Sequence, residues 1–293
     1  MISSLIRSTY ARVQAARFSL SGPERFYNPI SAALLSDIHH DQRVQENIRD
    51  VRIISRQDGL TIWQTRLGEL ATMESECQEH VAFLVTEFQP NQYFSAKVTV
   101  GPGATVLDVG ANVGLFTRAA VIAGAQRVIC MEPTPNTLRA LRRNVEKPGC
   151  AAKISIVPKG AWDVPTTLKF TVDPVRPGRS SCVTVTPEKT AYEISIEVDR
   201  IDNIVRELAL DRLDFIKMDI EGAEMNALKG AANTLRRFKP NLAIAVEHTE
   251  DRLKNATAVR DLVSGINPAY RCEPGTYSVT ERCQLAPEIL YFW

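Results

Sequence analysis

An acid and two glycines lie close together in the stretch TVLDVGANVGLFTRAA, residues 105–120. Asp108 stands near the end of an apolar run, and Gly110 and Gly114 follow in the spacing Asp-x-Gly-x-x-x-Gly. Glycine allows a tight turn in which a ligand can press against bare backbone, so the stretch predicts a nucleotide-type loop. The alternative is a turn that only packs a helix on a strand. The spacing departs from the Gly-x-Gly-x-x-Gly dinucleotide fingerprint, which disfavours a dehydrogenase.

A second acid, Glu132, ends the next apolar run along the chain, RVICME. A carboxylate at the end of the second strand can accept hydrogen bonds from both hydroxyls of a ribose. The combination of Asp108, the two glycines and Glu132 therefore predicts a ligand with a free ribose.

Ionisable side chains gather again in KMDIEGAE and at the end of NLAIAVEH: Lys217, Asp219, Glu221, Glu224, Glu247 and His248. Acids at a helix N-terminus are favoured by the helix dipole, which accounts for one of them. Glu224 could cap its helix by bonding to free amides. Lys217 alternates with Asp219 and suits a salt bridge as well as it suits catalysis.

The elements that must position these side chains alternate along the chain from about residue 104. Short apolar runs typical of strands are followed by amphipathic segments of about a dozen residues typical of helices. This alternation predicts an α/β fold with a doubly wound, mostly parallel sheet covered on both faces. Ligands of such sheets bind beyond the carboxyl ends of the strands, where Asp108, Glu132, Asp219 and Glu247 fall.

Residues 1–85 are predicted to form an N-terminal extension of helix and β-hairpin, with the hairpin turn at Asp58-Gly59 and a following helix over 74–89. Residues 86–293 are predicted to form the main domain, with an insertion at about 163–201. Insertions near strand ends are candidate substrate lids. Within this one, Arg179, Ser180 and Ser181 either contact a polar substrate or form a plain turn.

The composition limits the partners. Lys+Arg of 35 against Asp+Glu of 34 leaves a net charge of +1, and no apolar run is long enough to span a bilayer, so neither nucleic acid nor membrane is expected as a partner. Six dispersed cysteines without metal-site spacing favour a reducing cytoplasm and no structural zinc.

The first 23 residues, basic and free of acids, fit a docking helix or an organelle transit peptide. The histidines outside the candidate site are expected at the surface: His39, His40 and His80.

Taken together, VLDVGANVGLFTRAA, ICMEPTPNTLRALRRNV, FIKMDIEGAEMNALKGA and AIAVEH resemble the FkbM family of class I S-adenosylmethionine-dependent methyltransferases. The resemblance covers roughly residues 88–293. It implies a Rossmann-like sheet of seven strands and S-adenosyl-L-methionine as the cofactor. It also implies a small-molecule acceptor, the hydroxyl of a sugar or polyketide.

The resemblance also implies where the cofactor would bind. Its methionine end would lie against Asp108, Gly110, Ala111, Asn112 and Gly114, with Asp219 towards the transferred methyl group. The ribose would bind Glu132, beside Pro133. The adenine would lie near Gly160, Ala161, Trp162 and Asp163, although Trp162 serves equally well as a core anchor.

Methyl transfer to an alcohol requires a held acceptor and a base for its proton. The candidates are Asp219, Glu221, Glu247 and His248, and the unperturbed pKa of histidine, about 6.5, suits the task.

No metal is predicted, although Asp219, Glu221 and Glu247 could supply ligands to magnesium. Methylation of nitrogen or carboxylate, and a silent cofactor-binding scaffold, stay open as alternatives. The N-terminal extension could mediate oligomerisation.

Overall fold

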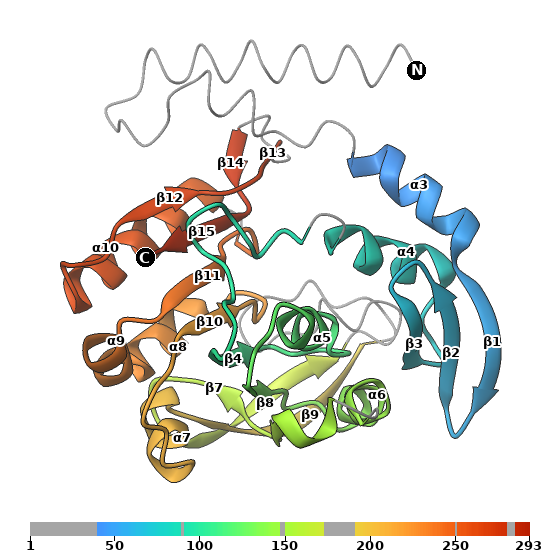
Figure 1. Ribbon diagram of the computed structural model, residues 1–293, viewed down its shortest axis with the longest axis horizontal. Coiled ribbons are helices and arrows are strands. Elements are labelled where there is room, and N and C mark those ends of the chain that lie inside the picture. Colours follow the sequence, from blue (N-terminus) through green and yellow to red (C-terminus); the bar gives the residue numbers. More distant parts are fainter. Residues whose placement is uncertain (1–39, 89–90, 147–149, 173–190, 250, 280–284) are drawn as a thin grey trace.

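The core of the structure is a seven-stranded sheet with the strand order β12-β15-β11-β10-β4-β5-β6. Figure 1 labels the part of this sheet from β12 to β4. This computed structural model describes residues 40–88, 91–146, 150–172, 191–249, 251–279 and 285–293. The strands of the sheet are β4 (Thr105–Val109), β5 (Arg127–Met131), β6 (Ile154–Val157), β10 (Phe215–Met218), β11 (Asn241–Ala245), β12 (Cys272–Pro274) and β15 (Ile289–Phe292).

The sheet is mostly parallel, because β15 alone pairs in antiparallel fashion with its neighbours β11 and β12. The chain builds outward from β4 through β5 to β6 and then returns to β10 on the other side of β4. The order therefore reverses between β4 and β10, which is where such sheets bind ligands. The predicted doubly wound, mostly parallel α/β fold with seven strands is confirmed.

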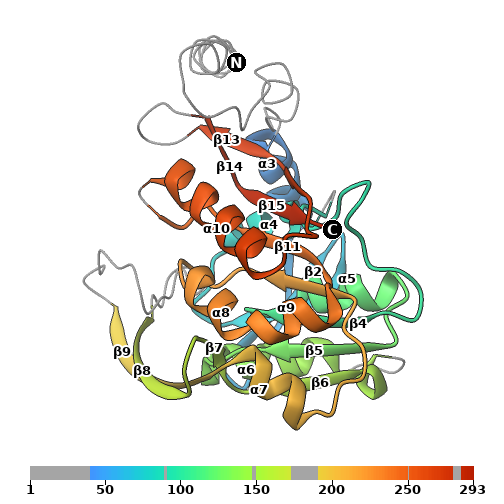
Figure 2. The same ribbon diagram turned by 90° about the vertical axis from the view of Figure 1, so that its left-hand side faces the viewer.

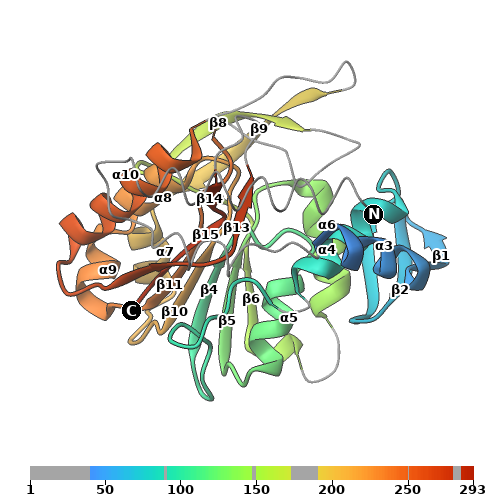
Figure 3. The same cartoon turned by 90° about the horizontal axis from the view of Figure 1, so that it is seen from above.

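Helices cover both faces of the sheet (Figure 3). One face packs against α7, α8, α9 and α10, with Leu107 and Met218 among the buried strand residues. The other packs against α5 and α6, with Val106 and Phe215 turned towards them. The helices are α5 (Leu115–Ile122), α6 (Pro135–Val145), α7 (Ile201–Glu207), α8 (Glu224–Gly230), α9 (Ala232–Phe238) and α10 (Arg252–Ile266), with the short turn η1 (Ala151–Lys153) before β6. Among the described residues, no helix has the length and apolar content that crossing a bilayer would need.

A separate three-stranded sheet precedes the core and lies beside α4 and α6 (Figure 1). It consists of β1 (Arg52–Gln57), β2 (Leu60–Thr65) and β3 (Gly68–Met73), flanked by α3 (His40–Asp50) and α4 (Gln78–Glu87). The predicted hairpin is confirmed, with Asp58 and Gly59 both at positive φ, whereas β3 was not foreseen. The division of the chain at residue 85 stays a prediction.

A further antiparallel pair extends from the molecule where the insertion was predicted (Figure 2). It comprises β8 (Thr166–Val172) and β9 (Tyr192–Asp199), which also pairs with the short β7 (Gly160–Ala161). Residues 173–190, with Arg179, Ser180 and Ser181, lie outside the described residues, as do the first 23 residues and His39. Another short pair, β13 (Tyr277–Val279) and β14 (Leu285–Pro287), precedes β15.

The prediction of one continuous helix over residues 223–235 is wrong. The pattern of residues 223–235 predicts a single helix, whereas the structure divides it into α8 and α9. The break falls at Ala231, whose φ of −105° and ψ of 4° are not helical. Gly230 ends α8 against the backbone of Trp162, whose carbonyl oxygen would lie 2.0 Å from a Cβ at that position. A tertiary contact, invisible in the local pattern, therefore accompanies the break.

Candidate functional site

The loop between β4 and α5, residues 110–114, is called here the glycine loop. Its backbone is left-handed at three positions: Gly110, Asn112 and Gly114. A Cβ on Gly110 would lie 2.0 Å from the carbonyl oxygen of Asp219, and one on Gly114 would lie 2.7 Å from Leu141 Cδ1. On the side where a Cβ would project, glycine is required at both positions by packing within the chain. This agrees with the alternative interpretation of the sequence, a turn that packs a helix on a strand. Contact of a ligand with the rest of the loop stays a prediction.

Substitution of Gly114 by Ala tests this packing. The positive φ of 86° and the contact with Leu141 both disfavour a side chain. We expect Gly114→Ala to lower the free energy of unfolding by about 2 kcal/mol in urea titrations. Gly103 is the matched control, since its φ is 78° and nothing lies within 4 Å of its Cβ position. Gly103→Ala should cost about 1 kcal/mol, and equal losses in both variants would contradict the packing argument.

Asp108 is fully buried beneath the glycine loop and faces α5. Its Oδ2 accepts a hydrogen bond from Thr117 Oγ1 at 2.6 Å, and its Oδ1 lies 3.5 Å from Lys217 Nζ. Lys217 in turn donates to the carbonyl oxygen of Gly110 at 2.7 Å. Asp108 and Lys217 therefore hold the loop from below. A direct contact of Asp108 with the cofactor stays a prediction.

Glu132 directly follows β5, beside the glycine loop, and is 6% exposed. Its two carboxylate oxygens accept amide hydrogen bonds from Asn112 at 3.1 Å and from Thr134 at 2.9 Å. Burial raises the pKa of Glu132, while hydrogen bonds from these amides and from the Thr134 side chain act against the rise. Because a carboxylate offers about four lone-pair sites, Glu132 can accept a further hydrogen bond beyond these three. The residue is thus fixed in place with acceptor capacity to spare.

Asp219 and His248 form a pair at the ends of β10 and β11. His248 Nε2 lies 2.8 Å from Asp219 Oδ1, and its Nδ1 lies 3.1 Å from Glu221 Oε2. Burial acts to lower the pKa of His248, but the two carboxylates outweigh it and hold the pKa well above its ordinary value. Both ring nitrogens therefore donate, and His248 is an imidazolium ion without a free lone pair at neutral pH.

The protonation of His248 can be measured directly. We expect the imidazole NMR signals to titrate well above pH 6.5. A raised folded-state pKa means that the stabilising contribution is complete below pH 6.5 and is lost as the pH rises through the folded value. His248→Asn should therefore cost about 2 kcal/mol of unfolding free energy at pH 6, with the difference from wild type shrinking as the pH rises. A difference that grows with pH would contradict the assignment.

The Asp219 carboxylate is held by three groups. Besides His248, Tyr93 Oη donates to Oδ2 at 2.6 Å, and Lys217 Nζ lies 3.9 Å away. Burial acts to raise the pKa of Asp219, but Lys217, His248 and Tyr93 outweigh it and keep the pKa below its ordinary value. Asp219 is thus a fixed anion and a weak base.

Glu247 has the opposite electrostatic environment. Burial and the neighbouring charge of Glu288 raise the pKa of Glu247 to about 7, although His248 and Arg252 act against the rise. Arg252 Nη1 lies 3.6 Å from Glu247 Oε2. A pKa in this range is the one at which a general base works best at neutral pH.

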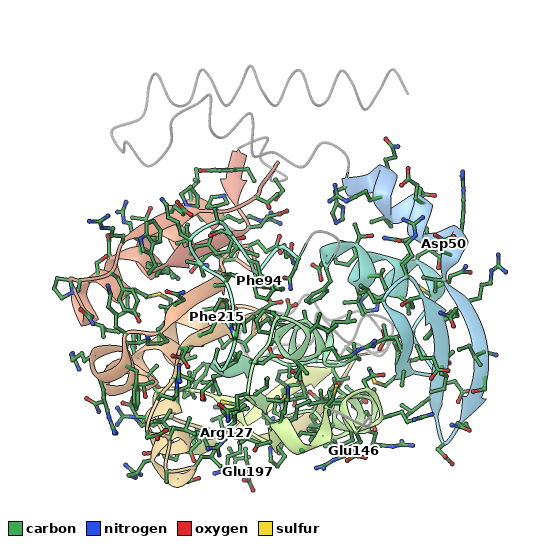
Figure 4. All side chains as sticks on the ribbon, viewed as in Figure 1. Asp50, Phe94, Arg127, Glu146, Glu197 and Phe215 are labelled. Carbon is green, nitrogen blue, oxygen red and sulfur yellow. The ribbon has the colours of Figure 1, made fainter. Side chains whose placement is uncertain are left out.

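Two residues of the site were missed by the sequence analysis, Tyr93 and Glu87. Tyr93 packs edge to face on Phe116, with ring centroids 5.6 Å apart. In the same aromatic cluster Phe94 packs edge to face on Phe215 at 6.0 Å (Figure 4). Glu87 ends α4, and burial followed by the charges of Asp219 and Glu247 raises its pKa well above its usual range. Both precede β4, in a segment whose pattern showed only an amphipathic helix ending near Pro90.

Two other predicted groups have definite places. Glu224 Oε1 accepts from the amides of Ile220 at 2.9 Å and Gly222 at 3.4 Å. The predicted bonding to free amides is therefore present, but these amides belong to the turn before α8 and not to the first turn of the helix. A Cβ on Gly160 would lie 3.7 Å from Pro133 Cγ, which brings the predicted adenine and ribose segments together. Trp162, half-buried, donates its backbone amide to Asp199. Its two interpretations stay open, and the adenine contacts of Ala161 and Asp163 stay predictions.

Within the described part of the chain, Asp219, Glu224 and His248 could together hold a metal ion. The ligand atoms that they offer lie within 4.8 Å of one another. All three side chains already bond within the chain, Asp219 to His248 and Tyr93, and Glu224 to backbone amides. The structure thus accounts for this cluster by protein contacts.

Comparison with known proteins shows the family of the chain. The family model described as the methyltransferase FkbM domain matches residues 108–268, more than half of the sequence. The chain belongs to the FkbM methyltransferase family. The matched range contains the glycine loop, Glu132, Asp219 and His248, whereas Glu87 and Tyr93 precede it.

Individual relatives of this FkbM chain are distant. It is 27% identical to methyltransferase sdnD of Sordaria araneosa, over 43% of this chain and 59% of that protein. It is 27% identical to hexuronic acid methyltransferase AglP of Haloferax volcanii, over 44% of this chain and 50% of that protein. The chain thus spans little more than half the length of these relatives. The crystal structure of methyltransferase FkbM from Methylobacillus flagellatus KT aligns with 20% identity and a TM-score of 0.49, covering 87% of this chain and 59% of that one.

Proposed function

We propose that the chain transfers a methyl group from S-adenosyl-L-methionine to a hydroxyl of a sugar or polyketide-type small molecule. The observation that carries the proposal is that the predicted cofactor residues and the candidate catalytic residues lie on the two sides of the point where the strand order reverses, between β4 and β10. The glycine loop follows β4 and Glu132 follows β5, while Asp219 lies at the end of β10 and Glu247 and His248 lie after β11. Family membership and the relative named for hexuronic acid, a sugar, support it.

The residues present fit an adenosyl cofactor. Glu132 is fixed in position by two backbone amides, and beside the Thr134 side chain it keeps acceptor capacity for the ribose. The glycine loop would follow the methionine portion, and residues 160–163 the adenine. When bound, the cofactor supplies an electrophilic methyl group on a positively charged sulfur.

The remaining chemistry belongs to the chain. A hydroxyl that attacks a methyl group must lose its proton as the new bond forms. His248 has both nitrogens bonded and Asp219 is held as a weak base, so neither suits the task. Glu247, with a pKa of about 7, accepts the proton. The fixed negative charge of Asp219 then serves to orient His248 and to favour a positively charged centre nearby.

The proposal is tested with isotope-labelled S-adenosylmethionine and a panel of hydroxylated sugars and polyketides. A product carrying the label as an O-methyl group, identified by mass spectrometry and NMR, supports it. Label found on nitrogen or carboxylate would move the function to the alternative kind of methylation. Tight cofactor binding without transfer to any acceptor class would favour a non-catalytic scaffold.

A further inference from the structure

Asn144 on α6 joins the N-terminal sheet to the glycine loop. The side chain is 2% exposed and uses its whole amide. Oδ1 accepts from the backbone amide of Ala71 at 2.7 Å, and Nδ2 donates to the carbonyl oxygen of Ala71 at 2.8 Å. Asn144 therefore pairs with β3 as a neighbouring strand would. The same Nδ2 donates to the carbonyl oxygen of Val113, within the glycine loop, at 2.8 Å.

The contact continues into the predicted cofactor site. Val113 follows Asn112, whose amide donates to the carboxylate of Glu132. One side chain thus connects an edge strand, the loop and the residue assigned to the ribose. A buried amide whose two donors and acceptor are all used is costly to disturb, so the connection is stiff.

Two further contacts hold the same sheet against the same loop. Arg118, in the helix that begins at the loop, donates to the carbonyl oxygens of Leu67 at 2.6 Å and Glu69 at 2.9 Å. Val113 is also buried in the apolar cluster that the N-terminal sheet forms with α4 and α6. The sheet therefore packs on the loop through both polar and apolar contacts, although it precedes the range matched by the family.

We propose that Asn144 is a positioning residue, through which the N-terminal sheet fixes the glycine loop in the conformation that binds the adenosyl cofactor. The inference rests on the proposed function, because it assigns the loop to that cofactor. It makes the N-terminal sheet part of the cofactor site rather than a detachable cap.

The test compares Asn144→Ala with Thr72→Val, both in the full-length chain. Thr72 is the matched control, since it lies next to Ala71 in β3 and accepts a buried hydrogen bond from Trp63 at 2.9 Å. Both variants should have a lower Tm. Calorimetric titration with S-adenosylhomocysteine, well below either Tm, should show about 5- to 10-fold weaker binding for Asn144→Ala and unchanged binding for Thr72→Val. Equal affinities in all three proteins, or equal losses in both variants, would overturn the proposal.

A measurement on the wild type covers the case in which Asn144→Ala does not fold. Coupling between two sites is reciprocal, so S-adenosylhomocysteine should slow hydrogen exchange at the Ala71 amide by a similar factor. Slowed exchange in the glycine loop with no change at Ala71 would overturn the inference alone. No binding of S-adenosylhomocysteine by the wild type would overturn the inference together with the proposed function.

Discussion

Glu247→Gln is expected to lower kcat by roughly 10²- to 10⁴-fold, the usual contribution of a general base. The glutamine keeps the size of the side chain but cannot accept the proton of the acceptor hydroxyl. In the wild type, kcat/KM should fall tenfold per pH unit below about pH 7, because burial and Glu288 raise the pKa of Glu247 to that value. The measurement is the rate of label transfer to a hydroxylated acceptor between pH 5 and 9.

Glu288→Gln is the matched control for this prediction. It leaves the base in place but removes the charge that raises the pKa of Glu247. The acidic limb of the pH profile should therefore move to lower pH, with kcat at pH 8 largely retained. Wild-type turnover in Glu247→Gln, or an acidic limb that Glu288→Gln leaves in place, would remove Glu247 from the mechanism.

The second large effect is expected at Glu132, where Ala should weaken S-adenosylhomocysteine binding by roughly 10²- to 10⁴-fold. The substitution removes two charge-assisted hydrogen bonds to the ribose, each worth about 1.5–3 kcal/mol. It also leaves the amides of Asn112 and Thr134 without their acceptor. The affinity is measured by calorimetry at a temperature where circular dichroism shows the variant folded.

Glu132→Gln separates ribose recognition from support of the loop. One amide oxygen remains to accept hydrogen bonds, so this variant should lose less affinity than Glu132→Ala. The analogue of S-adenosylhomocysteine that lacks the ribose hydroxyls should distinguish wild type from Glu132→Ala much less than the intact ligand does, because only the lost support of the loop remains. A clear preference of Glu132→Ala for the intact ribose would contradict the assignment.

The main fold was predictable because its signals are local. Apolar runs such as residues 105–109 and 241–245 have the length of buried strands, and helical spacing separates them. The break between α8 and α9 was not predictable, since the pattern continues through Ala231 while the contact of Gly230 with Trp162 is tertiary. β3 was missed because GELATM lacks the alternation of an exposed strand, being mostly buried on both faces.

In the candidate site, too, local sequence signals predicted the positions of residues, whereas tertiary contacts decided their roles. Asp219, Glu247 and His248 could be placed because carboxyl ends of neighbouring parallel strands meet at one edge. Their roles could not be assigned, because protonation depends on partners far apart in sequence. Tyr93 lies 126 residues before Asp219, yet its hydroxyl contributes to the low pKa of that acid. Glu221 bonds the second nitrogen of His248, which changes a candidate base into a cation.

Calorimetric titration with S-adenosylhomocysteine, and with NAD in parallel, tests whether an adenosyl cofactor binds at the glycine loop. We expect roughly micromolar binding of S-adenosylhomocysteine, none of NAD, and loss of binding in Glu132→Ala. No binding of S-adenosylhomocysteine, or binding that Glu132→Ala leaves unchanged, would contradict it.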